Sequence, residues 1–170
     1  MIKKKSRRKA FTLIEVITVL FVVSVALVGV MSLVVQSLNS QTYNKSNLIA
    51  YHLAQEGAEM IRGVRDSNWL AGPAWNANLG NGQYYMDYTD SAPHAYNPSV
   101  VPDQKILRLD NNGFYFHDPT GNATSSGFTR AIALGAFNNG EAMMIRVDIS
   151  WLDHGRTYYY ELVTYLYDWK

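Results

Sequence analysis

The longest uninterrupted apolar segment of the chain covers residues 16–35, from Val16 to Val35, and contains no charged side chain. As a helix with a rise of about 1.5 Å per residue, it would span about 30 Å, the thickness of the hydrocarbon core of a bilayer. The segment is rich in valine, which suits a strand, but strands rarely exceed about ten residues. A segment that faces lipid must also satisfy its own backbone hydrogen bonds. The pattern therefore predicts a transmembrane helix.

A second helical pattern follows the apolar segment. Residues 36–47 are polar but contain no proline or glycine, so we expect the helix to continue through them. Apolar and small residues then recur at the helical period: Ala50, Leu53, Ala54, Gly57, Ala58, Met60, Ile61 and Val64. We predict one helix from about Thr12 to about Arg65, about 80 Å long, with Gly29 and Gly57 as potential bends and stop signals in residues 67–73. Because Ala50, Ala54, Gly57 and Ala58 have small side chains, a sheet could lie close against that side of the helix.

The C-terminal part of the chain shows strand patterns. Residues 105–109 and 114–116 flank a turn at 110–113, and residues 129–134 form another candidate strand. The clearest pair is 142–152 against 157–169, where inward and outward positions alternate strictly and residues 153–156 close a hairpin. Residues 71–102 show little periodicity and read as a long surface loop. These patterns predict an α+β fold, with a long N-terminal helix packed on a C-terminal antiparallel β-sheet.

Charge is unevenly distributed along the chain. Six of the fifteen basic residues lie in the first ten positions, and the rest of the chain carries nine basic against fourteen acidic side chains, a net charge of −5. A basic N-terminal cluster is typical of a nucleic-acid arm or of the cytoplasmic flank of a membrane span. Because this cluster adjoins the apolar segment, it favours an N-terminus held inside the cell and an exported C-terminal region. The acidic remainder does not predict a nucleic-acid partner.

No arrangement of residues predicts catalysis. The chain has no cysteine, its four histidines are scattered without metal-ligand spacing, and it contains no phosphate-binding loop or nucleophile elbow. The segment at 110–113, with Asp118 downstream, shares only the start of a calcium-loop pattern, so a hairpin turn explains it better. We therefore expect no catalytic residue, no metal site and no cofactor, and no enzymatic activity.

Glu15 separates three interpretations of the N-terminus. A secretory signal peptide could be cut after Ala26, but the apolar segment continues well beyond that residue. A plain signal anchor explains the basic cluster and the length, but it does not explain a carboxylate at Glu15, inside the apolar stretch that begins at Phe11. Burying that charge costs roughly 2.5–3.5 kcal/mol at mid-bilayer and less near the interface, so Glu15 requires a partner.

The string KAFTLIE at residues 9–15 supplies the third interpretation. It resembles the prepilin processing motif of type IV pilins and type II secretion pseudopilins, G-F-T-L-I-E ahead of an apolar helix. Five residues, 11–15, match that motif in the expected place, whereas Ala10 replaces the usual glycine before the cut. The resemblance implies that a prepilin peptidase cleaves between Ala10 and Phe11 and methylates the new N-terminus at Phe11.

The resemblance also implies a role for Glu15. In a pilin filament the apolar helices bundle in the core, and this glutamate faces the N-terminal amine of a neighbouring subunit. Opposite charges at ~4 Å attract by several kcal/mol at an effective dielectric near 20, although desolvation removes much of that gain. The alternative is a carboxylate that reaches the lipid headgroups from the end of an anchor.

These implications define four expected regions of a pilin-like chain. Residues 1–10 would be a basic leader, 11–35 the transmembrane and assembly half of the helix, 36–70 its exported half, and 71–170 a variable loop followed by the sheet. The loop is where adhesion or partner specificity would reside, unless it is only a tolerated insertion.

The expected function is that of a structural subunit of a type IV pilus or a related pseudopilus. Its partners would be the prepilin peptidase, other pilin subunits, an inner-membrane assembly platform and the lipid bilayer. It would be inserted in the bacterial inner membrane before joining a periplasmic or extracellular filament. Adhesion, competence and secretion filaments all fit, as do major and minor subunits. The alternative is a monomeric single-span protein with an exported binding domain.

Overall fold

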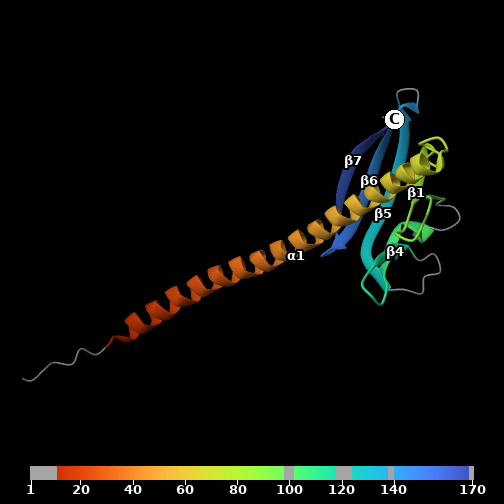
Figure 1. Ribbon diagram of the computed structural model, residues 1–170. Helices are drawn as coiled ribbons and strands as arrows, with labels where there is room; N and C mark the ends of the chain where they lie inside the picture. The colour runs from red at the N-terminus through yellow and green to blue at the C-terminus, as the bar shows by residue number, and fades with distance from the viewer. Residues whose placement is uncertain (1–10, 98–101, 118–123, 138–139, 169–170) are drawn as a thin grey trace, which may run out of the picture. The chain divides into compact units, whose positions relative to one another are not determined.

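The computed structural model describes residues 11–97, 102–117, 124–137 and 140–168. In chain order the elements are the helix α1 (Leu13–Ala71), the strands β1 (Gly82–Tyr85) and β2 (His94–Ala95), the short 3-10 helix η1 (Pro102–Lys105), and the strands β3 (Ile106–Leu109), β4 (Tyr115–His117), β5 (Thr124–Phe137), β6 (Ala142–Asp153) and β7 (Arg156–Tyr167) (Figure 1). The chain divides into two units between Tyr43 and Asn44.

The helix α1 is continuous from Leu13 to Ala71, which confirms the prediction of one long helix. It continues through both Gly29 and Gly57, and it reaches Ala71 rather than Arg65. It stops where Gly72 adopts a positive φ of 90°, and the amide of Gly72 donates to the carbonyl of Asn68 over 3.0 Å. Glycine takes this conformation at a helix C-terminus without steric cost, and Pro73 follows it.

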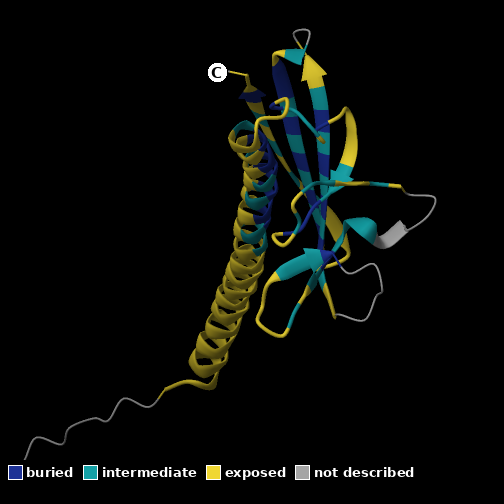
Figure 2. Cartoon of the chain, turned by 45° about the vertical axis from the view of Figure 1, so that its right-hand side comes forward, coloured by how far each residue is buried: buried dark blue, intermediate teal, exposed yellow. Residues whose placement is uncertain are grey.

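In the N-terminal unit every described residue of the helix is exposed, as the colouring of Figure 2 shows. Its few hydroxyl groups bond to the helix itself. Thr18 donates to the carbonyl of Ile14 over 2.6 Å, and Ser24 donates to that of Leu20 over 2.7 Å. These side chains are therefore satisfied without water, as a helix surrounded by lipid requires.

The C-terminal unit contains one antiparallel sheet of seven strands. β5 lies at its centre. One edge of β5 pairs with β6, which in turn pairs with β7, and the other edge pairs with both β1 and β3. The outer strands β2 and β4 pair with β1 and β3. The strands expected at 105–109, 114–116, 129–134, 142–152 and 157–169 are confirmed as β3 to β7, except that β7 ends at Tyr167 and residue 169 lies outside the described residues. β1 and β2, which lie in the segment interpreted as a loop, were not predicted.

The hairpin of β6 and β7 has a two-residue turn, His154 and Gly155, with φ values of 48° and 77°. Two positive φ values define the type I′ turn, whose twist matches that of antiparallel strands. The turn brings Asp153 opposite Arg156, and the register continues as far as Ala142 opposite Tyr167. The predicted hairpin is therefore correct.

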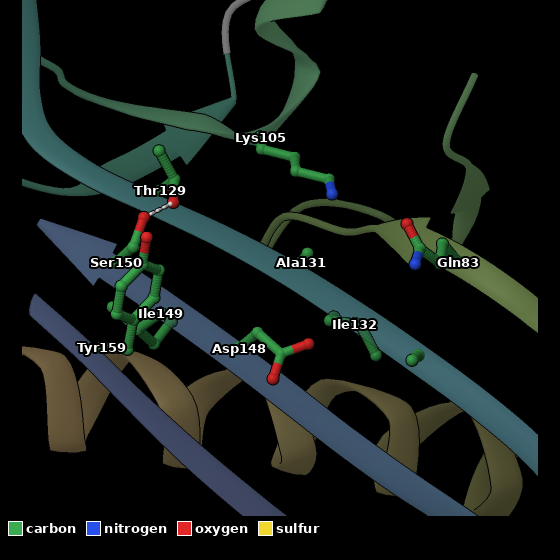
Figure 3. A pocket seen from close by; sticks show the side chains of 10 residues that line it. Gln83, Lys105, Thr129, Ala131, Ile132, Asp148, Ile149, Ser150 and Tyr159 are labelled. Atoms are coloured by element: carbon green, nitrogen blue, oxygen red, sulfur yellow. Dashed lines mark hydrogen bonds between the residues drawn. The ribbon is translucent and has the colours of Figure 1, made fainter. Parts of the chain in front are cut away.

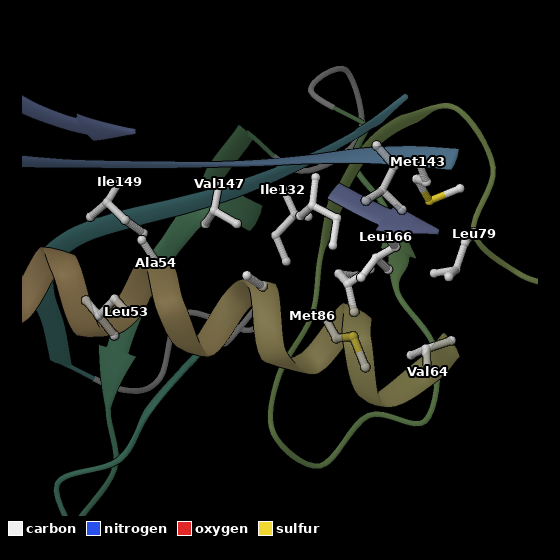
Figure 4. Close-up of a cluster of buried hydrophobic side chains, with 14 of the residues drawn as sticks. Leu53, Ala54, Val64, Leu79, Met86, Ile132, Met143, Val147, Ile149 and Leu166 are labelled. Atoms are coloured by element: carbon white, nitrogen blue, oxygen red, sulfur yellow. The ribbon is translucent and has the colours of Figure 1, made fainter. Parts of the chain in front are cut away.

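The core of this unit lies between α1 and one face of the sheet. The inward residues of β6 include Met143, Ile145, Val147, Ile149 and Trp151, and those of α1 are Ala50, Leu53, Ala54, Gly57, Ala58, Ile61 and Val64. Figure 4 shows Leu53, Ala54 and Val64 of the helix beside Met143, Val147 and Ile149 of the strand. A Cβ atom placed on Gly57 would lie 3.0 Å from Cγ1 of Val147, so the helix lies so close to the sheet here that a methyl group would require Val147 to shift. The helical period and the strand alternation read from the sequence thus meet in one core.

Candidate functional site

The first described residues, Phe11 and Thr12, precede the helix, and Ala10 lies outside the described residues. Thr12 is the N-cap of α1. Its Oγ1 accepts a hydrogen bond from the backbone N–H of Glu15 over 3.3 Å, and its carbonyl accepts from the same N–H over 3.1 Å. Since a threonine hydroxyl satisfies one of the amides that a helix start leaves unpaired, Thr12 fixes where the helix begins.

Glu15 is therefore the third residue of α1, in its first turn. The pair Thr12 and Glu15 has the spacing of a capping box, in which the N-cap hydroxyl bonds the amide three residues on. The pattern T-x-x-E at residues 12–15 of the sequence is a signal for this helix start. The positive end of the helix dipole also favours a carboxylate at this position. Glu15 is exposed, so its carboxylate is available to a group outside the chain.

The apolar residues after Glu15 form the second part of the site. From Val16 to Val35 no side chain is charged, and the large apolar side chains are about half exposed or more. Soluble monomers rarely expose apolar patches larger than a few hundred Å². By length and composition α1 can cross a membrane, and it is the single such helix among the described residues. This surface requires either lipid or the helices of other proteins around it.

A different polar cluster, which the sequence pattern did not predict, lies in the core of the C-terminal unit. Arg130 on β5 is fully buried. Its Nη1 donates to Oε2 of Glu56 on α1 over 3.1 Å, and its Nη2 donates to the carbonyl of Met86 over 2.8 Å. Asp87 lies 3.6 Å from the same guanidinium. One side chain thereby joins the helix, the sheet and the segment after β1.

Burial lowers the pKa of Arg130, whereas the nearby carboxylates of Glu56 and Asp87 act in the opposite direction. Asp87 also accepts from the backbone N–H of His117 over 3.0 Å, and one of its oxygens lies 2.6 Å from Nδ1 of that histidine. The cluster thus extends to β4. Because each of its charges has a partner within the fold, it is a structural element and not an open binding site.

The turn between β3 and β4 was predicted as a hairpin turn, and this is confirmed. Oδ1 of Asp110 accepts from the backbone N–H groups of Asn112 and Phe114, both over 2.8 Å. These bonds, the one from Phe114 foremost, lower the pKa of Asp110. Asp118 lies outside the described residues. Within the described part of the chain, no group of three or more His, Cys, Asp or Glu residues could hold a metal ion.

Comparison with known families gives one match, the prokaryotic N-terminal methylation motif, over residues 5–31. This is the signature of type IV pilins and pseudopilins. Neither the comparison with curated proteins nor that with solved structures gives a match. The matched residues include Ala10, Phe11 and Glu15 and much of the apolar segment.

The long apolar helix joined to an antiparallel sheet is a pilin-like α+β architecture. Together with the motif matched over residues 5–31, it supports a type IV pilin-like or pseudopilin precursor. Proteins with this motif are structural and not enzymatic. The apolar helix and the motif are those of a membrane-anchored single-pass protein.

Proposed function

We propose that the chain is a structural subunit of a type IV pilus or a related pseudopilus filament. The observation that carries this proposal is the methylation motif at residues 5–31, which overlaps the start of a helix with twenty uncharged, exposed residues at 16–35. In the bilayer this helix is solvated by lipid, and in a filament it is covered by the equivalent helices of other subunits. Both environments satisfy the same apolar surface.

The proposed processing site is the peptide bond between Ala10 and Phe11. A prepilin peptidase at the cytoplasmic face of the inner membrane cuts there and methylates the amine of Phe11. The six basic residues of the leader hold the N-terminus inside until cleavage, so that the C-terminal unit is exported. The short side chain of Ala10 allows it to occupy a pocket made for glycine.

In this proposal Glu15 is the assembly residue. Cleavage leaves a basic amine on Phe11, and the carboxylate of Glu15 on an adjacent subunit pairs with it as the helix leaves the headgroup region. Thr12 supports this arrangement because it fixes the first turn of α1, from which Glu15 projects. The pair sets the axial position of one subunit against the next more than it adds stability.

The test is the N-terminus of the mature protein from its host, read by intact mass and N-terminal sequencing. We expect a chain that begins at N-methylated Phe11 and is recovered in sheared filaments. Ala10→Gly should be processed faster, and Ala10→Phe should accumulate as the uncut precursor. A mature protein that retains Met1 or begins after Ala26 would contradict the proposal. Cleaved protein that never leaves the membrane would instead favour a monomeric anchored protein with an exported binding domain.

A further inference from the structure

The face of the sheet that points away from α1 carries a shallow groove (Figure 3). It has a volume of about 190 Å³ and is built by residues of β1, β5, β6 and β7 together with Lys105 of η1. All of these elements belong to the C-terminal unit. The groove is therefore separate from the N-terminal site and from the buried cluster around Arg130, whose side chain points to the opposite face.

Strand register explains the hollow. On the outer face of β5, Ala131 and Ala133 present only methyl groups, whereas their cross-strand neighbours Asp148 on β6 and Gln83 on β1 are longer. The short side chains form a floor and the longer ones form two walls. In Figure 3 the side chains of Gln83 and Asp148 stand on opposite sides of this floor.

One end of the groove is closed by polar and aromatic side chains. Thr129, Ser150 and Tyr159 occupy one row across β5, β6 and β7. The hydroxyl groups of Thr129 and Ser150 are hydrogen-bonded at 2.7 Å, and Tyr159 is 78% exposed. The groove therefore offers an aromatic ring beside hydroxyl, amide, carboxylate and ammonium groups.

The charges of the groove balance. Lys105 contributes one ammonium group, which also lies 4.3 Å from the ring centre of Tyr96, and Asp148 contributes one carboxylate, which accepts from Nε of Arg146 over 3.2 Å. A phosphate backbone would require clustered cations, which this lining does not supply. An added peptide strand would require a free sheet edge, whereas the groove lies on a face. A lipid tail would leave the polar walls unpaired.

We infer that this groove binds a neutral saccharide. Sugar hydroxyls both donate and accept hydrogen bonds, so one sugar ring can use the amide of Gln83, the carboxylate of Asp148 and the ammonium of Lys105 together. The apolar face of an adjacent sugar unit suits the exposed ring of Tyr159, which lies at one end of the groove. The volume is below the roughly 300–1,000 Å³ of sites for drug-sized ligands, so the site takes a short segment of a longer glycan.

The test uses the full chain in phosphatidylcholine nanodiscs, which contain no sugar headgroups. The probes are cellotetraose, maltotetraose, chitotetraose and the anionic tetragalacturonate, and binding is measured by saturation-transfer NMR and by titration. We expect saturable binding of at least one neutral probe. Tyr159→Ala should weaken it about tenfold, the loss expected for one aromatic contact. Ala131→Leu, which fills the floor, should abolish it.

The matched control is Tyr167→Ala, which removes a tyrosine that is 53% exposed on the same face of β7 but does not line the groove. It should bind like the wild type, and circular dichroism should show that all three variants are folded. The inference is overturned if no neutral probe binds saturably or if only tetragalacturonate binds. It is equally overturned if Tyr167→Ala weakens binding as much as Tyr159→Ala.

Discussion

The guanidinium of Arg130 donates a hydrogen bond to the carboxylate of Glu56 over 3.1 Å, although the two residues lie 74 positions apart in the chain. The bond connects β5 to α1 inside the core of the C-terminal unit. The same guanidinium donates to the carbonyl of Met86, which directly follows β1. Arg130 therefore connects three parts of the C-terminal unit: the helix α1, the strand β5 and the segment that follows β1.

We expect Arg130→Met to lower the free energy of unfolding by about 3 kcal/mol. The substitution removes the guanidinium and leaves the carboxylates of Glu56 and Asp87 without this counter-charge, which is costly inside a protein. The control is Arg62→Met, since Arg62 pairs with Glu59 on the exposed side of α1 and such pairs contribute below about 1 kcal/mol. Urea unfolding followed by near-UV circular dichroism measures both. Equal effects of the two variants would contradict a structural role for the buried pair.

The turn between β3 and β4 should give a pH-dependent contribution to stability. The pKa of Asp110 is lowered from its ordinary value of 3.8, chiefly by the backbone N–H of Phe114. A lowered pKa means that the contribution is present above pH 3.8 and is lost as the pH falls through the lower pKa of the folded state. We expect Asp110→Asn to reduce Tm at pH 7 and to have a smaller effect as the pH falls below 3.8. Thermal scans across this range test it, and a Tm difference that does not change with pH would refute it.

Sequence periodicity predicted those parts of the fold that depend on local pattern. The alternation of buried and exposed residues in β6, from Ile145 to Trp151, and the helical stripe from Leu53 to Val64 both lie on the predicted faces. Each pattern repeats over several residues, so the inward side is determined before the partner is known.

The elements that were missed depend on partners far along the chain. β1 has four residues and pairs with β5 about fifty residues later, so no alternation long enough to detect precedes the pairing. Arg130 occupies an inward position of its strand, but nothing in the neighbouring sequence indicates that it pairs with Glu56, 74 residues earlier in the chain. At the N-terminus the motif was readable, whereas the capping role of Thr12 depends on where the helix begins.

Two glycines of α1 should respond in opposite directions to the same substitution. Gly57→Ala adds a methyl group 3.0 Å from Cγ1 of Val147 and 3.4 Å from Cδ of Arg130, both buried, so we expect a loss of about 1 kcal/mol despite the better helix propensity of alanine. Gly63→Ala meets no atom within 4 Å. It should therefore gain up to about 1 kcal/mol. Urea unfolding of both variants is the measurement, and a gain for Gly57→Ala would show that the helix is not in close contact with β6.

The last prediction isolates the charge of Glu15. Glu15→Gln keeps the side-chain volume, and glutamine serves equally as the third residue of a capping box, so the helix should still begin after Thr12. Losing a charge also makes insertion in the membrane easier. Cleavage after Ala10 should therefore proceed, while the amine of Phe11 on the neighbouring subunit loses its counter-charge.

We expect cleaved Glu15→Gln protein to accumulate in the membrane fraction and to be absent from sheared filaments. The comparison is made in the host against the wild type and against Glu59→Gln, which removes an exposed carboxylate of the same helix in the C-terminal unit. Intact mass of the membrane fraction confirms that the N-terminus is methylated Phe11, so that a processing defect is not mistaken for an assembly defect. Filaments that contain Glu15→Gln at the wild-type level would assign Glu15 to the lipid headgroups, because only pairing with a neighbouring subunit makes its charge necessary for assembly.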